Sequence, residues 1–304
     1  MRLTYLFLLF ALLSGVMLTV ALSLNARLGG SLRSPLLAGM LSFAVGTVFL
    51  AAVSLAAEPW LSPARLADTR GWAWTGGLLG AFYLAANIVL IPRLGALTTI
   101  GLAVAGQMVA SLVIDHFGLL NVAVDPLTAG GVGGTVAAVL GAGMIAQLHK
   151  VDLSGEEALL LGFSVLIGAA LPAQAAINAE LRAEIGAPLL SGGISFAVGT
   201  LGLAAVLGAV IASTSQTLPA PARFQQTPRW AWFGGLFAAL YVDAVLVPLI
   251  GAAATIGFSV AGQQLASTFV DHFGWFGLPR KPVTPVRVAG VVLLLVGVAL
   301  IQVF

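Results

Sequence analysis

Long apolar runs constrain this chain more than any other feature. They are each about 20 residues long and are separated by short polar clusters. A helix of that length, rising about 1.5 Å per residue, crosses roughly 30 Å of hydrocarbon. The 304 residues include only 13 Lys or Arg and 11 Asp or Glu, whereas roughly a quarter of a soluble domain is charged. So few charged residues do not cover a water-facing surface, and the pattern predicts an all-α membrane protein.

The runs predict ten transmembrane helices. The first run resembles a secretory signal, but it is too long for the core of one and has an internal counterpart, so it is counted as a span. The longest connection, residues 213–229, is a polar loop too short to form a domain. The spans are expected near residues 4–24, 35–57, 71–91, 94–115, 128–147, 158–177, 187–212, 230–248, 250–271 and 285–303.

An internal repeat covers nearly the whole chain. GQMVASLVIDHFG at 106–118 matches GQQLASTFVDHFG at 262–274, and WAWTGGLLGAFY at 72–83 matches WAWFGGLFAALY at 230–241. Repeats of this kind set the architecture of a protein. Each copy holds five predicted spans, which is an odd number. A short linker therefore makes the second copy begin on the opposite side of the membrane.

The odd span count predicts two inverted five-helix repeats (5+5), related by a pseudo-two-fold axis in the membrane plane. Many secondary transporters have such an arrangement. The expected domains are a first repeat at 1–148, a linker at 149–157 and a second, inverted repeat at 158–304.

The distribution of Lys and Arg predicts the orientation. Nine of the 13 lie in the linker and in the loops after spans 1, 3, 7 and 9, and only four lie on the opposite side. Cytoplasmic loops are enriched in these residues, so the termini are expected in the periplasm. The bias comes almost wholly from the second repeat.

A polar stripe follows one helix face in each repeat. Gln107, Ser111 and Asp115 are spaced four residues apart and therefore share a face. The second copy of the stripe consists of Gln263, Ser267 and Asp271. In a membrane such a face turns toward protein or a water-filled cavity. Two interpretations stay open: the amides line a cavity, or they hydrogen-bond helices together at about 0.6 kcal/mol each.

Other repeated polar residues are expected at helix ends. The pairs Asp115-His116 and Asp271-His272 precede Phe-Gly, which is typical of an interfacial cap and turn. Asn25 and Asn178 follow the first span of each repeat, where capping or turn formation competes with ligand contact.

Asp243 is the only acidic residue well inside a predicted span, and its repeat counterpart is Asn87. An ionisable group inside the membrane is a functional hypothesis by default, because the bilayer disfavours its charged form. We therefore expect Asp243 to bind a proton or cation. The alternatives are that it lies nearer the surface than the predicted span boundaries place it, or that a neighbouring hydroxyl satisfies it. The other expected members of a substrate- or cation-binding set are Tyr241, Tyr83 and Gln174.

The sequence contains no pattern typical of an enzyme. The three histidines lack metal-ligand spacing, cysteine is absent, and no P-loop or GxSxG motif occurs. No cofactor or metal is expected, and any pumping must run on a gradient. The formal net charge of +2, with no basic run longer than two residues, argues against a nucleic-acid partner.

Four motifs, each present twice, resemble those of the YdcZ-like family of the drug/metabolite transporter superfamily. In the first repeat they are N-A-x-L from Asn25, S-F-x-x-G-T from Ser42, W-A-W-x-G-G from Trp72 and A-G-Q…S…D-H-F-G from Ala105. The resemblance implies a bacterial inner-membrane exporter in a fused, two-repeat form. Ala21 departs from the family pattern, which usually has Gln at this position, as Gln174 does here.

These observations predict a secondary-active exporter of a small organic or amphiphilic solute. Its expected partners are that solute and the lipid bilayer, with no obligatory protein partner because the two repeats are fused. A passive channel or facilitator would transport without coupling and ignore neutralisation of Asp243. A non-transporting membrane scaffold would show no flux.

Overall fold

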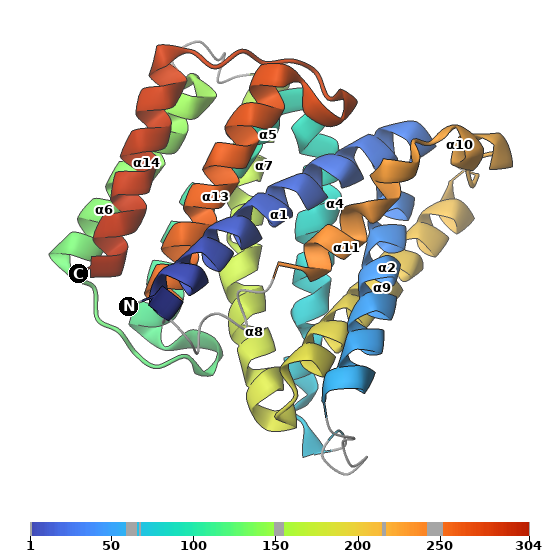
Figure 1. Ribbon diagram of the computed structural model, residues 1–304, viewed down its shortest axis with the longest axis horizontal. Helices are drawn as coiled ribbons and strands as arrows, with labels where there is room; N and C mark the ends of the chain where they lie inside the picture. The colour runs from blue at the N-terminus through green and yellow to red at the C-terminus, as the bar shows by residue number, and fades with distance from the viewer. Residues whose placement is uncertain are drawn as a thin grey trace. The chain divides into compact units, whose positions relative to one another are not determined.

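A computed structural model describes residues 2–58, 66, 68–148, 155–214, 217–241 and 252–303. Within these ranges every regular element is a helix, which confirms the all-α prediction (Figure 1). The α-helices are α1 (Arg2–Leu32), α2 (Pro35–Ala57), α4 (Gly76–Leu94), α5 (Ala96–Phe117), α6 (Ala129–Ala146), α7 (Glu156–Gly168), α8 (Ala170–Ile185), α9 (Pro188–Ser213), α10 (Pro221–Gln226), α11 (Gly234–Ala239), α13 (Ala252–Phe273) and α14 (Pro285–Val303). Short 3-10 helices are η1 (Gly71–Thr75), η2 (Leu119–Asn121), η4 (Arg229–Phe233) and η5 (Trp275–Gly277).

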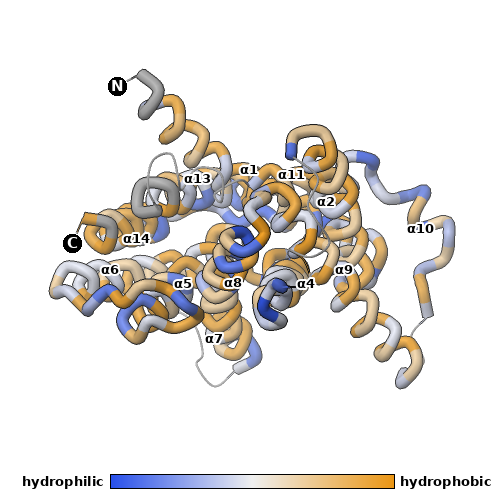
Figure 2. The backbone as a smooth tube through the Cα atoms, turned by 90° about the horizontal axis from the view of Figure 1, so that it is seen from below, coloured by the Kyte–Doolittle hydropathy of each residue, from blue (hydrophilic) through white to orange (hydrophobic). Residues whose placement is uncertain are grey.

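Seven helical segments of the described chain are long and apolar enough to cross a membrane, and Pro285–Ile301 forms a shorter apolar helix. Figure 2 shows that the helices are mostly hydrophobic and that the connection carrying α10 is largely hydrophilic. A multi-pass membrane protein is therefore confirmed. The count of ten spans stays a prediction, since the eighth predicted span, 230–248, runs into residues 242–251, outside the described residues.

Helix boundaries follow local sequence signals. Ser34 accepts a hydrogen bond from the Leu37 N–H at 3.3 Å and precedes Pro35 in the first turn of α2. At the other ends, α5 and α13 stop at Gly118 and Gly274, whose φ angles of 60° and 66° are left-handed. Glycine adopts this conformation without steric cost, so the Phe-Gly pairs close both helices.

Helix α1 extends beyond its predicted end. It continues to Leu32, because nothing breaks it until Ser34 and Pro35, and Asn25 is therefore buried inside it. Asn178 likewise lies inside α8 rather than at its end. The expectation that Asn25 and Asn178 occupy helix ends was wrong.

The chain forms two compact units that do not coincide with the two sequence repeats. The first unit contains Met1–Val20, Leu90–Ala173 and Tyr241–Phe304, and the second contains Ala21–Val89 and Gln174–Leu240. Each unit is therefore built from corresponding segments of both repeats. The division into repeats at 1–148 and 158–304 stays a prediction.

In the first unit, α6 and α14 lie side by side through glycines (Figure 1). The backbone at Gly297 lies against Gly134, and the backbone at Gly290 lies against Gly141. Repeat alignment makes Gly134 equivalent to Gly290, and Gly141 equivalent to Gly297. The two contacts are thus the same contact made twice, and the helices run antiparallel. Small residues permit this close backbone approach in membranes.

Two further contacts in the first unit have the same reciprocal form. Gly15 of α1 lies against the Ser259 carbonyl of α13, and Gly262 lies against the Leu12 carbonyl. Helices α7 and α5 repeat both contacts at the equivalent positions, which are Gly168 with Ala103 and Gly106 with Val165. The first helix of each repeat therefore packs on the fourth helix of the other.

In the second unit, α2 and α9 pack through aromatic rings and glycines (Figure 1). Phe43 and Phe196 are repeat equivalents, and their rings stack with centroids 4.8 Å apart. Each ring also covers the other helix's glycine, Phe43 on Gly199 and Phe196 on Gly46. The identical segment SFAVGT, present once in each helix, thus contacts its own copy.

The glycine contacts predict a position-specific stability effect. In Gly141→Val a new side chain would meet the backbone of Leu294 and Gly290, so α6 and α14 must separate. We expect a loss of about 1–3 kcal/mol, typical of overpacking. The control is Gly133→Val, since no atom lies near a side chain added there. Thermal unfolding in detergent should show a lower midpoint for Gly141→Val only, and equal midpoints would contradict the packing described.

Candidate functional site

The predicted amides of the polar stripe are buried in the first unit. Gln107 lies on α5 with its Nε2 atom unpartnered among the described residues. Gln263 lies on α13, where its Nε2 donates to the Ser259 hydroxyl at 3.5 Å and its Oε1 has no described partner. Burying a polar atom without a hydrogen-bond partner in hydrocarbon costs several kcal/mol of free energy. The Gln107 Nε2 can therefore donate a hydrogen bond to a bound molecule, and the Gln263 Oε1 can accept one.

Gln264, the next residue on α13, was missed by sequence reasoning. It is fully buried, and neither of its amide atoms has a hydrogen-bond partner among the described residues. Its side chain lies against Gly101 of α5. Gln264 is not identical between the repeats, because its counterpart is Met108. The difference between GQM and GQQ was the signal that could have identified it.

The serines of the stripe differ in their surroundings. Ser267 is fully buried, and its hydroxyl donates to the Gln264 carbonyl at 3.1 Å. Ser111, its equivalent on α5, is only partly buried. Ser267 is thus satisfied by its own helix.

Asp271 caps a helix that is distant from it in the sequence. One carboxylate oxygen accepts from the Ala96 N–H at 2.6 Å and the other from the Leu97 N–H at 3.2 Å. Helix α5 begins after Gly95, which offers no side chain to cap it. The Asp271 carboxylate therefore caps α5 in place of a local side chain. Only 2% of the Asp271 side chain is exposed, and its negative charge interacts favourably with the positive N-terminal end of the helix dipole.

The Asp-His pairs also organise two equivalent turns. The Asp115 carbonyl accepts from the Asp125 N–H at 2.9 Å, and the Asp271 carbonyl accepts from the Lys281 N–H at 2.8 Å. The Nδ1 atoms of His116 and His272 each accept a backbone N–H, from Leu127 and Val283 respectively, at 3.4 Å. The Asp-His pair therefore closes the same turn in both repeats.

Tyr83 and Asn87 lie together on α4 in the second unit. Asn87 is fully buried, and its Nδ2 donates to the Tyr83 carbonyl at 2.8 Å. The Asn87 Oδ1 and the Tyr83 hydroxyl have no partner among the described residues. This pair adds a second buried set of free polar atoms.

Three more predicted amides of the second unit lie against glycines. Asn25 contacts Gly234 and Asn178 contacts Gly76, which are equivalent contacts in the two repeats. Gln174 lies against Gly80. Both amide atoms of Asn25 and the Oδ1 of Asn178 have no partner among the described residues. The glycines provide the room that these side chains occupy.

Two predicted residues lie at or beyond the edge of the described structure. Tyr241 follows α11 and is partly buried, and Asp243 lies outside the described residues. The other described candidates for solute or cation binding are divided between the two units. Gln107, Ser111, Gln263 and Ser267 belong to the first, and Asn25, Tyr83, Asn87, Gln174 and Asn178 belong to the second.

Comparison with known proteins gives consistent matches. The family model described as "Putative inner membrane exporter, YdcZ" matches residues 6–144 and again residues 159–300. The chain is 30% identical over 139 residues to the "Inner membrane protein YdcZ" of Escherichia coli (strain K12), covering 45% of this chain and 93% of that protein. It also matches one crystal structure with a TM-score of 0.61 at 16% identity, covering 99% of this chain and 97% of that one, a likeness of fold alone.

The cap made by Asp271 predicts a stability effect. Asp271→Ala leaves the Ala96 and Leu97 N–H groups without acceptors, so we expect a loss of about 2 kcal/mol. Asp271→Asn retains one acceptor and should lose less. The control is Asp115→Ala, because Asp115 is only partly buried. Unfolding midpoints in detergent that fall in the order wild type, Asn, Ala would support the cap, and an unchanged Asp271→Ala midpoint would exclude it.

Proposed function

Since the chain belongs to the YdcZ family of inner membrane exporters within the drug/metabolite transporter superfamily, we propose that it exports a small organic or amphiphilic solute by secondary-active transport. The observation that carries this proposal is a set of buried amides on α5 and α13, each with at least one atom that has no partner among the described residues: Gln107, Gln263 and Gln264. Such atoms are costly in a membrane interior and are retained at substrate and ion pathways.

We further propose that the ten helices form two inverted repeats, 1–148 and 158–304, joined by the linker 149–157. A two-fold axis along the membrane normal would make equivalent helices parallel, whereas an axis in the membrane plane makes them antiparallel. The reciprocal glycine contacts between α6 and α14 run antiparallel and support the second case. The family model matches once in each repeat, which supports a fused form. The termini are then periplasmic by the distribution of Lys and Arg.

The buried amides are proposed to hydrogen-bond the solute on its way through the protein. Gln107 and Gln263 occupy equivalent positions, and Gln264 adds a donor and an acceptor that the first repeat lacks. A pathway lined by neutral amides accommodates polar groups without requiring a charged solute. Because one repeat carries an extra amide, the pathway is asymmetric.

We assign the coupling of transport to a proton gradient to Asp243, which lies outside the described residues. Its repeat counterpart Asn87 is fully buried, with an Oδ1 that has no partner among the described residues, and this supports the assignment. A carrier driven by a proton gradient needs a group that alternates between charged and neutral forms. Asp243 is the one acidic side chain that the predicted spans place deep in the membrane.

Neutralising Asp243 should separate coupling from transport itself. Asp243→Asn keeps the shape of the side chain and removes its titration, so accumulation driven by an imposed pH gradient should be abolished. Solute exchange across the membrane should persist. The measurement is flux in proteoliposomes, after a screen of chemically diverse solutes identifies one that moves.

The matched control is Asp125→Asn, which removes a carboxylate from the loop before α6. Accumulation by Asp243→Asn equal to that of the wild type would make Asp243 structural. A wild type that only equilibrates the solute would be a passive facilitator, and the absence of flux for every solute would favour a scaffold.

Gln264 offers a second test, because it separates stability from transport. Gln264→Met introduces the residue found at the equivalent position in the first repeat and removes an unpartnered amide. The unfolding midpoint should therefore stay close to that of the wild type. Solute flux should fall about tenfold, equivalent to one lost hydrogen bond. Leu265→Met, at an exposed neighbouring position, is the control, and unchanged flux in Gln264→Met would remove Gln264 from the pathway.

A further inference from the structure

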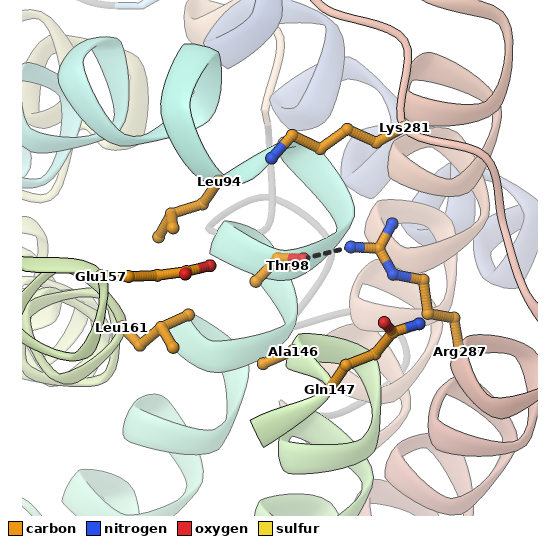
Figure 3. Close-up of a pocket in the computed structure, with 8 residues that line it drawn as sticks. All are labelled: Leu94, Thr98, Ala146, Gln147, Glu157, Leu161, Lys281 and Arg287. Atoms are coloured by element: carbon orange, nitrogen blue, oxygen red, sulfur yellow. Dashed lines mark hydrogen bonds between the residues drawn. The ribbon is translucent and has the colours of Figure 1, made fainter. Parts of the chain in front are cut away.

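A small polar cavity of about 140 Å³ lies at one end of the first unit. Helices α4, α5, α6, α7 and α14 all begin or end around it (Figure 3). Lys281 reaches it from the loop before α14, and Arg287 reaches it from the first turn of α14. Glu157 lies across from them. Thr98 and Gln147 add neutral polar groups. Arg287 adjoins Asp271, the last residue of the second polar stripe, but the cavity is lined by residues other than the amides of the proposed pathway.

Arg287 reaches this cavity with one donor that has no partner in the described part of the chain. Its side chain is only 11% exposed, its Nη2 donates to the Thr98 hydroxyl at 3.1 Å, and its Nε has no partner among the described residues. The nearest carboxylate contact, from Nη1 to the Asp271 Oδ2, is 4.0 Å long. Figure 3 shows the guanidinium turned toward Thr98 at the cavity. A largely buried guanidinium normally holds a closer anion.

Asp271 compensates the cations only in part. Its two carboxylate oxygens already accept the N–H groups that begin α5. Lys281 donates to the Arg93 carbonyl at 2.7 Å, and its ammonium has further N–H groups with which it can donate to an anion. Burial lowers the pKa of Lys281, an effect that the negative charge of Asp271 opposes. Glu157 is exposed, so its charge is screened by water.

The other repeat provides an internal control for the role of the two cations. Asp125 is equivalent to Lys281, and Gly131 is equivalent to Arg287. That turn makes the same backbone hydrogen bond to its aspartate carbonyl, at 2.9 Å against 2.8 Å. The threonine hydroxyls before the two helices also accept equivalent hydrogen bonds: Thr128 from the Gly131 N–H, and Thr284 from the Arg287 N–H. The turn thus folds without either cation, so the fold alone does not explain them.

We propose that Arg287 and Lys281 bind one oxyanion group, a phosphate or a carboxylate, in this cavity. Charge-assisted donors of this kind are strong ligands for such groups, and arginine matches their geometry. Basic pockets between transmembrane helices also bind phospholipid head groups. The group therefore belongs either to an anionic lipid or to a water-soluble anion. The site does not depend on the coupling or the solute proposed above.

The test uses the full chain in phosphatidylcholine nanodiscs, with or without phosphatidylglycerol, and inorganic phosphate as the soluble probe. Unfolding midpoints and native mass spectrometry report binding. At least one probe should bind the wild type, and Arg287→Gln or Lys281→Gln should weaken that probe about tenfold, the effect of one charge-assisted hydrogen bond. The control is Arg280→Gln, which removes the same charge from an exposed position of the same loop and should change affinity less than about twofold.

The outcomes separate the two sources of the group. Binding of phosphatidylglycerol alone identifies a lipid site, and binding of inorganic phosphate in pure phosphatidylcholine identifies a soluble anion. Lys281→Asp, which copies the first repeat, provides a second variant in case Arg287→Gln fails to fold. The proposal is overturned if neither probe binds the wild type, or if Arg280→Gln weakens binding as much as the cavity variants do.

Discussion

The close approach of helix backbones through glycine is the constraint on which the rest of this structure depends. Lipid is as apolar as the helix surfaces, so burial of apolar side chains does not by itself drive helices together. Gly134, Gly141, Gly290 and Gly297 let α6 and α14 pack backbone to backbone, and Gly15 and Gly262 do the same for α1 and α13. Because equivalent glycines make equivalent contacts, one packing solution is used twice.

Polar residues in this framework serve two physical purposes. Some complete the fold, as Asp271 does when its carboxylate accepts the first N–H groups of α5. Others, such as Gln264 and Asn25, are buried with no described partner for either amide atom. The membrane interior penalises an unsatisfied polar group far more than one whose hydrogen bonds are made. A satisfied group is therefore explained by stability, whereas the unsatisfied amides of α5 and α13 are the ones proposed to meet a solute.

The two repeats share their packing and differ in their chemistry. Glycines, the SFAVGT segments and the Asp-His turns are common to both, whereas the second repeat alone has Gln174, Gln264, Lys281 and Arg287, with Ala21, Met108, Asp125 and Gly131 at the equivalent positions. Contacts at the repeat interface must fit their own copies and stay alike. Residues outside these reciprocal contacts are free of that requirement.

The sequence by itself determined the helical class, the membrane environment, the repeat and the family, because apolar run length and repeated motifs are local properties. The apolar run predicted an end near residue 24, but α1 continues past Asn25 to the Ser34-Pro35 break, because the length of an apolar run marks a membrane span and not the end of a helix. Tertiary structure alone decided that Asp271 caps α5 and that Arg287 reaches Thr98, residues 175 and 189 positions apart. Such partners come from helix packing across the two repeats, which no local pattern records.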